Sequence, residues 1–567
     1  MSPIDYSVYL VTGRDLLPPG QSFESTLTAA LSSGVTLVQL REKTADTGDF
    51  LTIARTTKAI CDAHNVPLLI NDRVDIALAV GAAGVHVGQD DMQVKDARAL
   101  LPPGAIVGVS CNSADDVRRA RADGADYVGI GAVYGTMTKN VKNPLLGPRA
   151  VGALLALLDG SHIRAVAIGG IGAGNLARTL RGAIADSGRA LDGVAVVSDI
   201  MASKEPGKAA AKLAAIVKDF KKSMSAPNPE KPLHVPDLLD EVVRVMNVVR
   251  ELNPLVHQIT NTVVTTQSAN ITLAAGASPI MATAPKKSAN WLLSLDVVGA
   301  MRVVGPAANL ARTPLVFDPV GVGATAFRKR TTQGLLDGFQ CVLDCERGVW
   351  ISVLKGNAGE LAAVAGLQTS TPTGIESGLK PIPGAEEVRA KGVDTAGPGF
   401  TDPAGFVRAL AGREHCTTLL SGATDYVSDG ARCVRVSNGV EVLGRVTGSG
   451  CMLGSLVATY CAAAAHIADL DAAAAHIADL DGAAAKADVD GADTDTSTVV
   501  RGDTSTVVRG DMLVGALTGV LVLSIAAEIA AERPDVHGPG TFLPALMDEV
   551  ARLAPEEVRA RARVEAV

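Results

Sequence analysis

The stretch "PLLINDRVDIALAVGAAGVHVGQDD", residues 67–91, twice runs a short apolar segment into acidic residues, with a helix-like segment between the two. The first apolar segment ends in Asn71–Asp72 and the second ends in Asp90–Asp91. A strand, a helix and a second strand in this order predict a βα unit in which neighbouring strands run parallel. The carboxyl ends of parallel neighbours lie side by side, so Asp72 and Asp91 are predicted to face one shared space.

The same alternation extends over residues 1–220. Short apolar runs rich in β-branched residues occur there at 8–12, 35–40, 66–70, 84–88, 105–110, 126–131, 164–168 and 193–198. The segments between these runs are helix-like; "SADDVRRARADGAD", for example, opens with an N-cap serine, Ser113, and early acids. Eight βα units in this length predict a (β/α)8 TIM barrel, with a doubly wound open sheet as the alternative.

Residues 221–236, "KKSMSAPNPEKPLHVP", interrupt the alternation with prolines and small polar residues, and are predicted to form a linker. A second α/β pattern follows over residues 237–567. Its apolar strand candidates end near glycine, proline or polar residues and lie at 315–317, 349–354 and 417–421. The pattern predicts a second α/β domain, with a mostly parallel sheet flanked by helices.

Identical tandem copies interrupt the second domain. "AAAAHIADLD" occurs at 462–471 and 472–481, and "TSTVVRGD" occurs at 496–503 and 504–511. These copies indicate a recent duplication in a tolerant, low-complexity surface insert (462–511), because solenoid repeats need several units to bury a core. His466 and His476 are ten residues apart on an Ala-rich helix, which is a poor spacing for a metal site, so both are predicted to be structural or neutral.

The composition excludes several classes of protein. The 567-residue chain has a net charge of −8 and no basic footprint, so nucleic acid is not expected as a partner. Eight cysteines without a CxxC pair predict free thiols, and the N-terminus has no pattern of a secretory signal. The apolar segment 512–532 ends in Glu528 and Glu532, which favours a buried helix over a membrane span. A cytoplasmic protein without a membrane partner is therefore expected.

Polar residues follow the predicted barrel strands, at the end where barrels carry their catalytic groups. Gln39, Arg41 and Lys43 alternate along an extended segment and so point one way, and two of them are cationic, as a bound diphosphate requires. Asp72 and Asp91 are hard oxygen ligands suited to Mg²⁺, with substrate phosphates and water completing the shell.

The loops after the last two barrel strands are suited to a phosphate. Gly169–Gly170 and the amides around Val197–Ser198 stand where barrels often bind phosphate groups. Alone, an isolated "REK" is usually a solvated charge run and a GG pair is usually a turn. The joint placement of all these residues at one face of the barrel is what indicates a site.

The motifs "VQLREK", "INDRVDIA", "GVHVGQDD", "GVSC", "GTMTK" and "AIGGI" occur in that order, and residues 5–220 resemble thiamine-phosphate synthase over the whole domain. The resemblance implies that hydroxymethylpyrimidine diphosphate is joined to a thiazole phosphate, while Mg²⁺ and cationic side chains stabilise the leaving pyrophosphate. Thiazole tautomerase-like proteins of the same barrel group lack the full metal and diphosphate set. The two aspartates and "TMTK" argue against that alternative.

The resemblance also implies roles for individual residues. The pyrimidine diphosphate would be held by Gln39, Arg41, Lys43, Asn71, Ser110 and Lys139, of which Ser110 and Lys139 are the predicted catalytic residues. Mg²⁺ would be held by Asp72 and Asp91. The thiazole phosphate would be bound by Thr136, Thr138, Gly170, Val197 and Ser198.

Three Gly-rich segments of the second domain predict a nucleotide and phosphate-transfer site. "FDPVGVGAT" places Asp318 at the end of an apolar strand, and "LKGNAGE" places Lys355 and Glu360 at the end of another. "RVTGSGCMLGS" is a turn entering an apolar helix, which aims backbone N–H groups at an anion. Cys451 stands at that helix start, where a thiolate is favoured.

Together with "ITN" (259–261) and "GASPIMA" (276–282), these segments resemble hydroxyethylthiazole kinase, of ribokinase-like fold, over residues 237–555 with gaps. The resemblance implies ATP-dependent phosphorylation of 4-methyl-5-(2-hydroxyethyl)thiazole. Met281 and Gly448 would contact the thiazole. Lys355, in place of the family's usual arginine, and Ser421 would lie on ATP, with Asp318 and Glu360 near Mg²⁺. Cys451 would be catalytic, at a position where related kinases carry an aspartate base.

The interval 283–317 departs from this family, because it is short and lacks an Asn-Ile-Gly-Thr-like turn. An alternative is therefore a non-catalytic second domain that serves as an oligomerisation or ligand-sensing module. The kinase's product would be the synthase's second substrate, so the fusion predicts a bifunctional thiamine-biosynthesis enzyme with small-molecule partners. Hydroxyethylthiazole kinases form trimers, so the resemblance also implies a homo-oligomer through the kinase domain, a trimer or hexamer.

Overall fold

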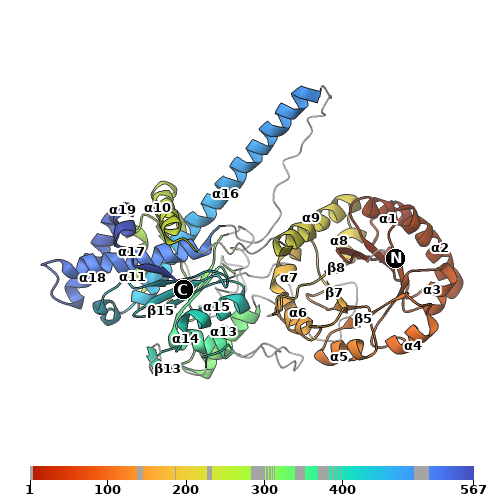
Figure 1. Cartoon of the computed structure of the whole chain (residues 1–567), viewed down its shortest axis with the longest axis horizontal. Coiled ribbons are helices and arrows are strands. Elements are labelled where there is room, and N and C mark those ends of the chain that lie inside the picture. The colour runs from red at the N-terminus through yellow and green to blue at the C-terminus, as the bar shows by residue number, and fades with distance from the viewer. Residues whose placement is uncertain are drawn as a thin grey trace, which may run out of the picture.

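Two domains lie side by side, a closed barrel and an α/β domain built on an open sheet (Figure 1). The computed structural model describes residues 4–136, 145–185, 187–225, 233–281, 301, 304–305, 308, 311, 313–338, 351–367, 382–385, 388–391, 394–396, 399–490 and 510–567. The barrel comes first in the chain, and the helix that follows it ends shortly before the second domain begins.

The first domain is the predicted (β/α)8 barrel, and the open-sheet alternative is wrong. Its strands close in chain order and pair in parallel throughout, β8 against β1 included. The strands are β1 (Val8–Val11), β2 (Leu37–Leu40), β3 (Leu68–Asn71), β4 (Gly84–Val87), β5 (Ile106–Cys111), β6 (Tyr127–Ile130), β7 (Arg164–Ile168) and β8 (Gly193–Val196). The helices are η1 (Arg14–Leu16), α1 (Phe23–Leu31), α2 (Thr47–Ala63), α3 (Val74–Val80), α4 (Val94–Leu100), α5 (Ala114–Ala122), α6 (Gly147–Ala156), α7 (Leu176–Gly182), α8 (Ser198–Met201) and α9 (Pro206–Ser225).

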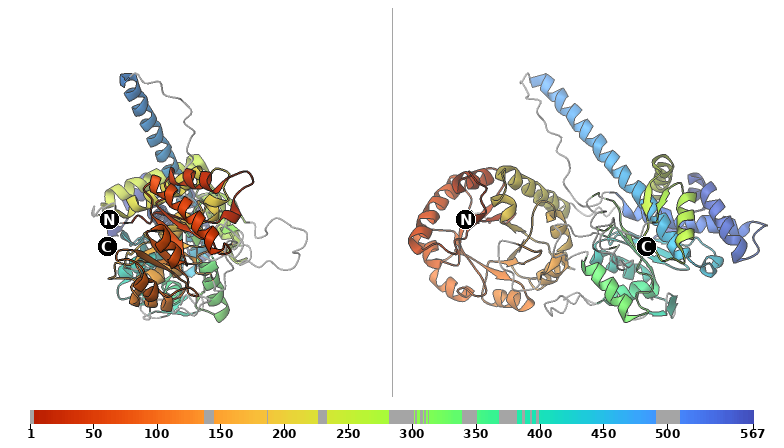
Figure 2. Two further views of the ribbon diagram at one scale, coloured as in Figure 1. Left: turned by 90° about the vertical axis from the view of Figure 1, so that its right-hand side faces the viewer. Right: turned by 180° about the vertical axis from the view of Figure 1, so that it is seen from behind.

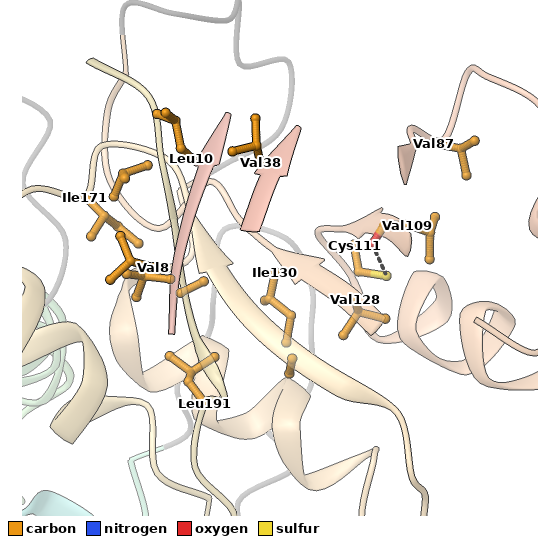
Figure 3. Close-up of a cluster of buried hydrophobic side chains, with 14 of the residues drawn as sticks. Val8, Leu10, Val38, Val87, Val109, Cys111, Val128, Ile130, Ile171 and Leu191 are labelled. Atoms are coloured by element: carbon orange, nitrogen blue, oxygen red, sulfur yellow. Dashed lines mark hydrogen bonds between the residues drawn. The ribbon is translucent and has the colours of Figure 1, made fainter. Parts of the chain in front are cut away.

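Alternate residues of each barrel strand serve two different cores. Val8 and Leu10 belong to the large cluster between the strands and the outer helices, part of which is drawn in Figure 3. Tyr9 and Val11 belong to a smaller cluster inside the barrel. This period-two alternation is the strand geometry that the apolar runs predict. The predicted N-cap is also confirmed, because Ser113 closes a capping box at the start of α5.

The second domain is α/β, but the expectation of a mostly parallel sheet is wrong. Its six-stranded sheet has the order β11-β12-β15-β16-β17-β18, and only the pairs β11–β12 and β12–β15 are parallel. These strands are β11 (Val316–Phe317), β12 (Val353–Asn357), β15 (Thr417–Ser421), β16 (Asp425–Ser428), β17 (Cys433–Val436) and β18 (Val564–Ala566). The parallel half contains the three predicted strands, and the antiparallel half was not predicted.

Helices and short strands cover this sheet. The small paired strands are β9 (Leu255–His257) with β10 (Ser278–Ile280), and β13 (Arg389–Lys391) with β14 (Asp394–Ala396). The helices are α10 (Val235–Leu252), α11 (Thr265–Ala274), α13 (Ala326–Gly338), α14 (Ala358–Ala365), α15 (Pro403–Glu414), η2 (Glu441–Arg445), α16 (Ser449–Asp490), α17 (Met512–Glu532), α18 (Pro539–Arg552) and α19 (Pro555–Arg561).

Helix α16 contains both copies of the first duplication. It enters the domain beside α17 and then continues away from it as a single helix (Figures 1 and 2). The expectation of a surface segment is wrong for the first copy, 462–471, because Ala463, Ala464 and Ile467 are buried in the core of the domain. The second histidine and most of the second duplication lie outside the described side chains, while His466 is half-buried.

Two helices are long and apolar enough to span a membrane by length and composition, Ser449–Asp471 and Met512–Glu532. The first is 67% and the second 83% buried inside the molecule. Helix α17 packs against α16 and α18 and is buried along most of its length. It is therefore a core helix, as predicted for 512–532.

Both ends of the predicted linker 221–236 are helical, since α9 continues to Ser225 and α10 begins at Val235. A buried ion pair also joins the domains. Arg149 on α6 donates to Glu414 at the end of α15, and Arg413 bonds the same carboxylate. Burial alone would raise the pKa of Glu414, but the two guanidinium groups hold that pKa below its usual value.

Candidate active sites

The predicted synthase residues gather at the carboxyl ends of the barrel strands. Gln39 is the next-to-last residue of β2 and Asn71 is the last residue of β3, and each alternates with a residue of the outer core. Arg41 follows β2, and its backbone N–H donates to the Thr12 hydroxyl at 3.0 Å. The carboxylate of Glu42, which lies between the two cations in the sequence, pairs with Arg14 at 2.7 Å. Glu42 is therefore engaged elsewhere, and the positive charges of Arg41 and Lys43 are available to a ligand.

The two aspartates of the opening stretch stand on adjacent strand ends. Asp72 has a φ of +66°, and its N–H donates to the carbonyl oxygen of His86 on β4 at 2.8 Å. Asp91 follows β4, and its Oδ2 accepts from the N–H of Gly88 at 2.7 Å. In the described part of the chain no three His, Cys, Asp or Glu side chains are arranged around a metal site. Two carboxylates suit Mg²⁺ only if substrate and water oxygens complete the shell.

The loop after β7 is compact because it contains two left-handed glycines. Gly169 has a φ of +100° and Gly170 a φ of +64°. A Cβ at Gly170 would lie 2.3 Å from the carbonyl oxygen of Gly135, so only glycine fits against the segment that leads into Thr136. Val197 and Ser198 lie at the end of β8 and the start of α8. Thr138 and Lys139 lie outside the described residues.

A buried chain of hydrogen bonds crosses the barrel, and the sequence analysis missed it. The Gln39 amide donates to the Tyr9 hydroxyl at 2.5 Å, and that hydroxyl lies 2.7 Å from the Tyr127 hydroxyl. The Tyr127 hydroxyl lies 2.7 Å from Nδ1 of His86, whose Nε2 lies 2.9 Å from the Ser110 hydroxyl. Two predicted substrate-binding residues on different strands are thereby connected through the barrel interior.

The interior is shaped to hold these polar rings. Gly108 on β5 is required beside Tyr127, because a Cβ there would lie 2.0 Å from carbon atoms of the Tyr127 ring. The Tyr127 ring packs at a 5.1 Å centroid distance from Tyr6 and 5.8 Å from Tyr9. Barrel interiors are usually filled by branched aliphatic side chains. A histidine and tyrosines at inward strand positions are the sequence signal that could have revealed the chain of hydrogen bonds.

In the second domain, a buried ion pair lies between two strand ends. The Lys355 ammonium on β12 donates to Oδ2 of Asp318, just after β11, at 2.8 Å. The two side chains are 3% and 18% exposed. Burial alone would lower the pKa of Lys355, but Asp318 outweighs it and the pKa lies above its usual value. Lys355 is therefore held as an ammonium beside Asp318.

Glu360 braces the turn that carries Asp318. It forms a capping box with Asn357 at the start of α14, and its Oε1 accepts from the N–H of Gly321 at 2.8 Å. Burial, together with Asp318, raises the pKa of Glu360. The second carboxylate oxygen of Asp318, Oδ1, is buried without a hydrogen-bond partner in the described structure. A buried unpaired carboxylate oxygen is the atom on which a cation or a ligand donor is expected.

The first turn of α16 lies over this pair. Gly448 has a φ of +88°, and a Cβ on it would lie 2.8 Å from a methyl carbon of Val264. A Cβ on Gly450 would lie 3.6 Å from the Lys355 ammonium, and one on Gly454 would lie 3.8 Å from Oδ2 of Asp318, so the start of the helix packs closely against both charged groups. The structure thus brings together the three predicted Gly-rich segments.

The expectation of a thiolate at Cys451 is wrong. Burial raises the pKa of the Cys451 thiol, and the Asp318 carboxylate adds to that rise, against Lys355 and a hydrogen bond with Thr260. The helix start favours a thiolate, but a nearby carboxylate and a half-buried position favour the neutral thiol.

Asp425 is a further buried acid near this site that the sequence analysis missed. Its Oδ1 accepts from the N–H of Gly422 at 2.9 Å, in the turn after Ser421. Burial raises the pKa of Asp425 to about 7, against the Gly422 hydrogen bond and the Lys355 charge. Met281 is half-buried and directly follows β10. The interval 283–317, whose shortness raised the alternative of a non-catalytic domain, lies largely outside the described residues.

Comparisons with known proteins match both domains in the same order. A family model described as "Thiamine monophosphate synthase" matches residues 8–200, and one described as "Hydroxyethylthiazole kinase family" matches residues 246–382 and 374–502. A thiamine-phosphate synthase of Alkaliphilus oremlandii is 41% identical over 38% of this chain and 97% of that protein.

Two fungal proteins are similar over both domains. A probable thiamine biosynthetic bifunctional enzyme of Schizosaccharomyces pombe is 34% identical over 98% of this chain and 96% of that protein. A thiamine biosynthetic bifunctional enzyme of Saccharomyces cerevisiae is 33% identical over 79% of this chain and 85% of that protein. The similarity therefore includes the fusion itself.

Proposed function

The chain belongs to the family of bifunctional thiamine biosynthetic enzymes, and on that premise we propose how its two sites share the work. Its barrel is a thiamine-phosphate synthase and its second domain is a hydroxyethylthiazole kinase. The kinase phosphorylates 4-methyl-5-(2-hydroxyethyl)thiazole with ATP. The synthase then joins the resulting thiazole phosphate to hydroxymethylpyrimidine diphosphate, giving thiamine phosphate and pyrophosphate.

In the synthase, the C–O bond to the diphosphate breaks, and the thiazole nitrogen forms the new C–N bond. Because negative charge develops on the leaving pyrophosphate, the cationic Arg41 and Lys43 would stabilise it, together with Lys139. Asn71 and Gln39 would hold the pyrimidine, and Ser110 would donate to the diphosphate. Gly169 and Gly170 would hold the thiazole phosphate, together with Thr136, Thr138, Val197 and Ser198.

Asp72 and Asp91 would hold Mg²⁺ in the synthase. The support for this proposal is their position after adjacent parallel strands and the hard oxygen donors that both carry, which suit Mg²⁺ when substrate and water oxygens complete the shell. Bound there, the ion would supply positive charge to the leaving pyrophosphate.

In the kinase, the γ-phosphoryl group of ATP would be transferred to the thiazole alcohol beside the first turn of α16. The supporting observation is the unpaired Oδ1 of Asp318, with Lys355 on the other oxygen. Asp318 would hold Mg²⁺ directly, and Glu360 would support it by fixing the turn at Gly321. Lys355 and Ser421 would contact ATP.

Cys451 would lie at the reacting hydroxyl, with Met281 and Gly448 around the thiazole. Its thiol rests protonated, so it would orient the alcohol through a hydrogen bond, and the hydroxyl proton would pass to an oxygen of the transferred phosphoryl group. Phosphoryl transfer is largely a matter of positioning and charge stabilisation, so a strong base is not required beforehand.

We also propose a cytoplasmic homo-oligomer, a trimer or hexamer through the kinase domain. Three large apolar side chains are exposed on or beside β9 and α11: Leu255 at 64%, Val263 at 68% and Leu273 at 58%. Contact with a second copy would remove this apolar area from water. Analytical ultracentrifugation tests the proposal, and a monomer at micromolar concentration would refute it.

A paired assay tests the two activities. One sample contains the protein with hydroxyethylthiazole, ATP, Mg²⁺ and hydroxymethylpyrimidine diphosphate, and the other contains preformed thiazole phosphate without ATP. Thiamine phosphate is expected in both. Asp318→Ala should abolish product only in the first sample, and Asp72→Ala should abolish it in both while ATP-dependent phosphorylation of the thiazole continues. Product from neither wild-type sample would overturn the proposal.

A further inference from the structure

The hydrogen-bond chain inside the barrel consists of Gln39, Tyr9, Tyr127, His86 and Ser110, here called the relay. Its three inner members are buried: Tyr9 is 1%, Tyr127 0% and His86 7% exposed. The two end members, Gln39 on β2 and Ser110 on β5, are substrate-binding residues in the proposed function. The strands β3 and β4 separate these ends, so the relay connects opposite parts of the mouth.

The relay has a direction. The Gln39 amide nitrogen can only donate, so the Tyr9 oxygen accepts and its proton must point to Tyr127. The Tyr127 proton then points to Nδ1 of His86. A histidine that accepts at Nδ1 carries its proton on Nε2, and this proton is donated to the Ser110 oxygen. Burial raises the pKa of Tyr9 and Tyr127, so both phenols keep the protons that this order needs.

We propose that the relay fixes the hydrogen-bonding polarity of the synthase site, and that Tyr9, Tyr127 and His86 are positioning residues for the coupling reaction. Because the Gln39 amide nitrogen donates to Tyr9, its side-chain carbonyl oxygen would face the mouth of the barrel. There it would accept a hydrogen bond from an N–H group such as the amine of an aminopyrimidine. With the Ser110 oxygen accepting from His86, its own proton faces the mouth as a donor for a phosphate oxygen.

The packing around the relay indicates that its side chains orient other groups and do not only fill the core. Apolar side chains of the same size would pack the barrel at no cost in unsatisfied polar atoms. Instead, the glycine at position 108 makes room for the Tyr127 ring, since a Cβ there would lie 2.0 Å from its carbon atoms. Buried polar networks of this kind hold their members in one arrangement only when every member is satisfied.

The decisive variant is Tyr127→Phe, which removes the central hydroxyl and keeps the ring. Tyr6→Phe is the matched control, because the Tyr6 ring packs on Tyr127 but its hydroxyl is not part of the relay. Each full-length variant is assayed for coupling of preformed thiazole phosphate with hydroxymethylpyrimidine diphosphate. A fall of about tenfold or more in kcat/KM for the pyrimidine is expected for Tyr127→Phe, and less than about twofold for Tyr6→Phe.

A double-mutant cycle separates positioning from packing. Because Tyr127 acts partly through Ser110, the penalty of Tyr127→Phe should be clearly smaller in a Ser110→Ala background than in the wild type, and the remainder should come from the arm that leads to Gln39. Fully additive penalties would overturn the proposal, because they would mean that Tyr127 does not act through Ser110.

The direction of the hydrogen bonds can be measured in the wild-type protein, and a variant is needed only to assign the signals. Nitrogen NMR of the protein labelled at its nine histidines identifies the ring tautomers, with the His86 signals assigned by their loss in His86→Gln. Protonation on Nε2 is expected, and protonation on Nδ1 would overturn the proposal. The inference rests on the proposed synthase function, but the two can fail separately: a wild-type protein without coupling activity refutes the function, whereas the wrong tautomer refutes the relay.

Discussion

Replacing Lys355 by methionine should destabilise the kinase domain and leave the barrel unchanged. Methionine keeps the length of the lysine stem, so the main loss is the ion pair with Asp318. The Asp318 carboxylate would then have one oxygen that already lacks a partner and another that has lost its lysine. Removing one partner of a buried pair costs about 3–5 kcal/mol. Because Asp318 remains 18% exposed, the lower end of that range is expected.

Calorimetry of the full-length protein measures this effect with an internal control. The shift in Tm per kcal/mol falls as a domain grows and is about 1.5–2 °C for a domain as long as residues 237–567, so a loss of about 3 kcal/mol should lower the kinase transition by about 4–6 °C. The barrel transition should not move. The matched control is Lys329→Met on α13, an exposed lysine of the same domain, for which little change is expected.

A double variant tests the cause. If the destabilisation comes from the orphaned carboxylate, adding Asp318→Asn to Lys355→Met should recover part of the lost Tm, because the buried charge is gone. A kinase transition that stays within about 2 °C of the wild type in Lys355→Met would refute the reasoning. So would a double variant whose losses simply add.

Three further results are expected. Gly108→Ala should lower the Tm of the barrel transition in calorimetry by overpacking the Tyr127 ring, at a cost of about 1–3 kcal/mol; an unchanged transition would show that the ring moves freely. Asp425 has a folded-state pKa raised to about 7 from 3.8, so its contribution to stability is full below about pH 4 and is lost as the pH rises through about 7, on the order of 4 kcal/mol at most. Asp425→Asn should therefore flatten the pH dependence of the kinase transition between pH 4 and 7, and an unaltered profile would contradict this. Deleting 472–481 should leave both the kinase transition and ATP turnover within error of the wild type, since the first copy, 462–471, supplies the same ten residues to the core.

The barrel could be predicted from the sequence because its evidence is local and repeated. Each apolar run lies within two residues of an observed strand, and the polar strand ends fall where parallel strands must bring them together. The antiparallel half of the kinase sheet could not be predicted in this way. Strand β17 pairs with β18, which is three residues long and lies at the other end of the domain sequence. Such short strands are defined by their partners and not by their own composition.

In the candidate sites too, features set by neighbouring residues could be predicted from the sequence, whereas features set by residues distant in the chain could not. A Gly-rich turn entering a helix is visible in the sequence, so the place of Cys451 was predicted. The protonation of its thiol depends on burial and on Asp318, more than a hundred residues earlier in the chain, so it was not. The relay was missed for a related reason, because its one signal, polar rings at inward strand positions, is spread over three strands. Gln39 and Ser110 lie within recognisable sequence motifs. Tyr9 and Tyr127 form their hydrogen bonds only when the barrel closes and brings their strands together.

The two sites handle buried polar groups differently, and this difference predicts how they fail. The relay consists of uncharged hydrogen-bonding groups, so removing the Tyr127 hydroxyl leaves two neutral partners, Tyr9 and His86, without that bond, at a smaller cost in stability than an orphaned charge. Its orientation, however, depends on every link, so the activity of the synthase should be more sensitive than its folding. The kinase site holds a buried pair of charges, and removing either one leaves an uncompensated ion. Substitutions at the kinase site should therefore reduce stability and phosphoryl transfer together. The thermal transition of the barrel, and not residual kinase activity, is for that reason the reference for kinase-site variants.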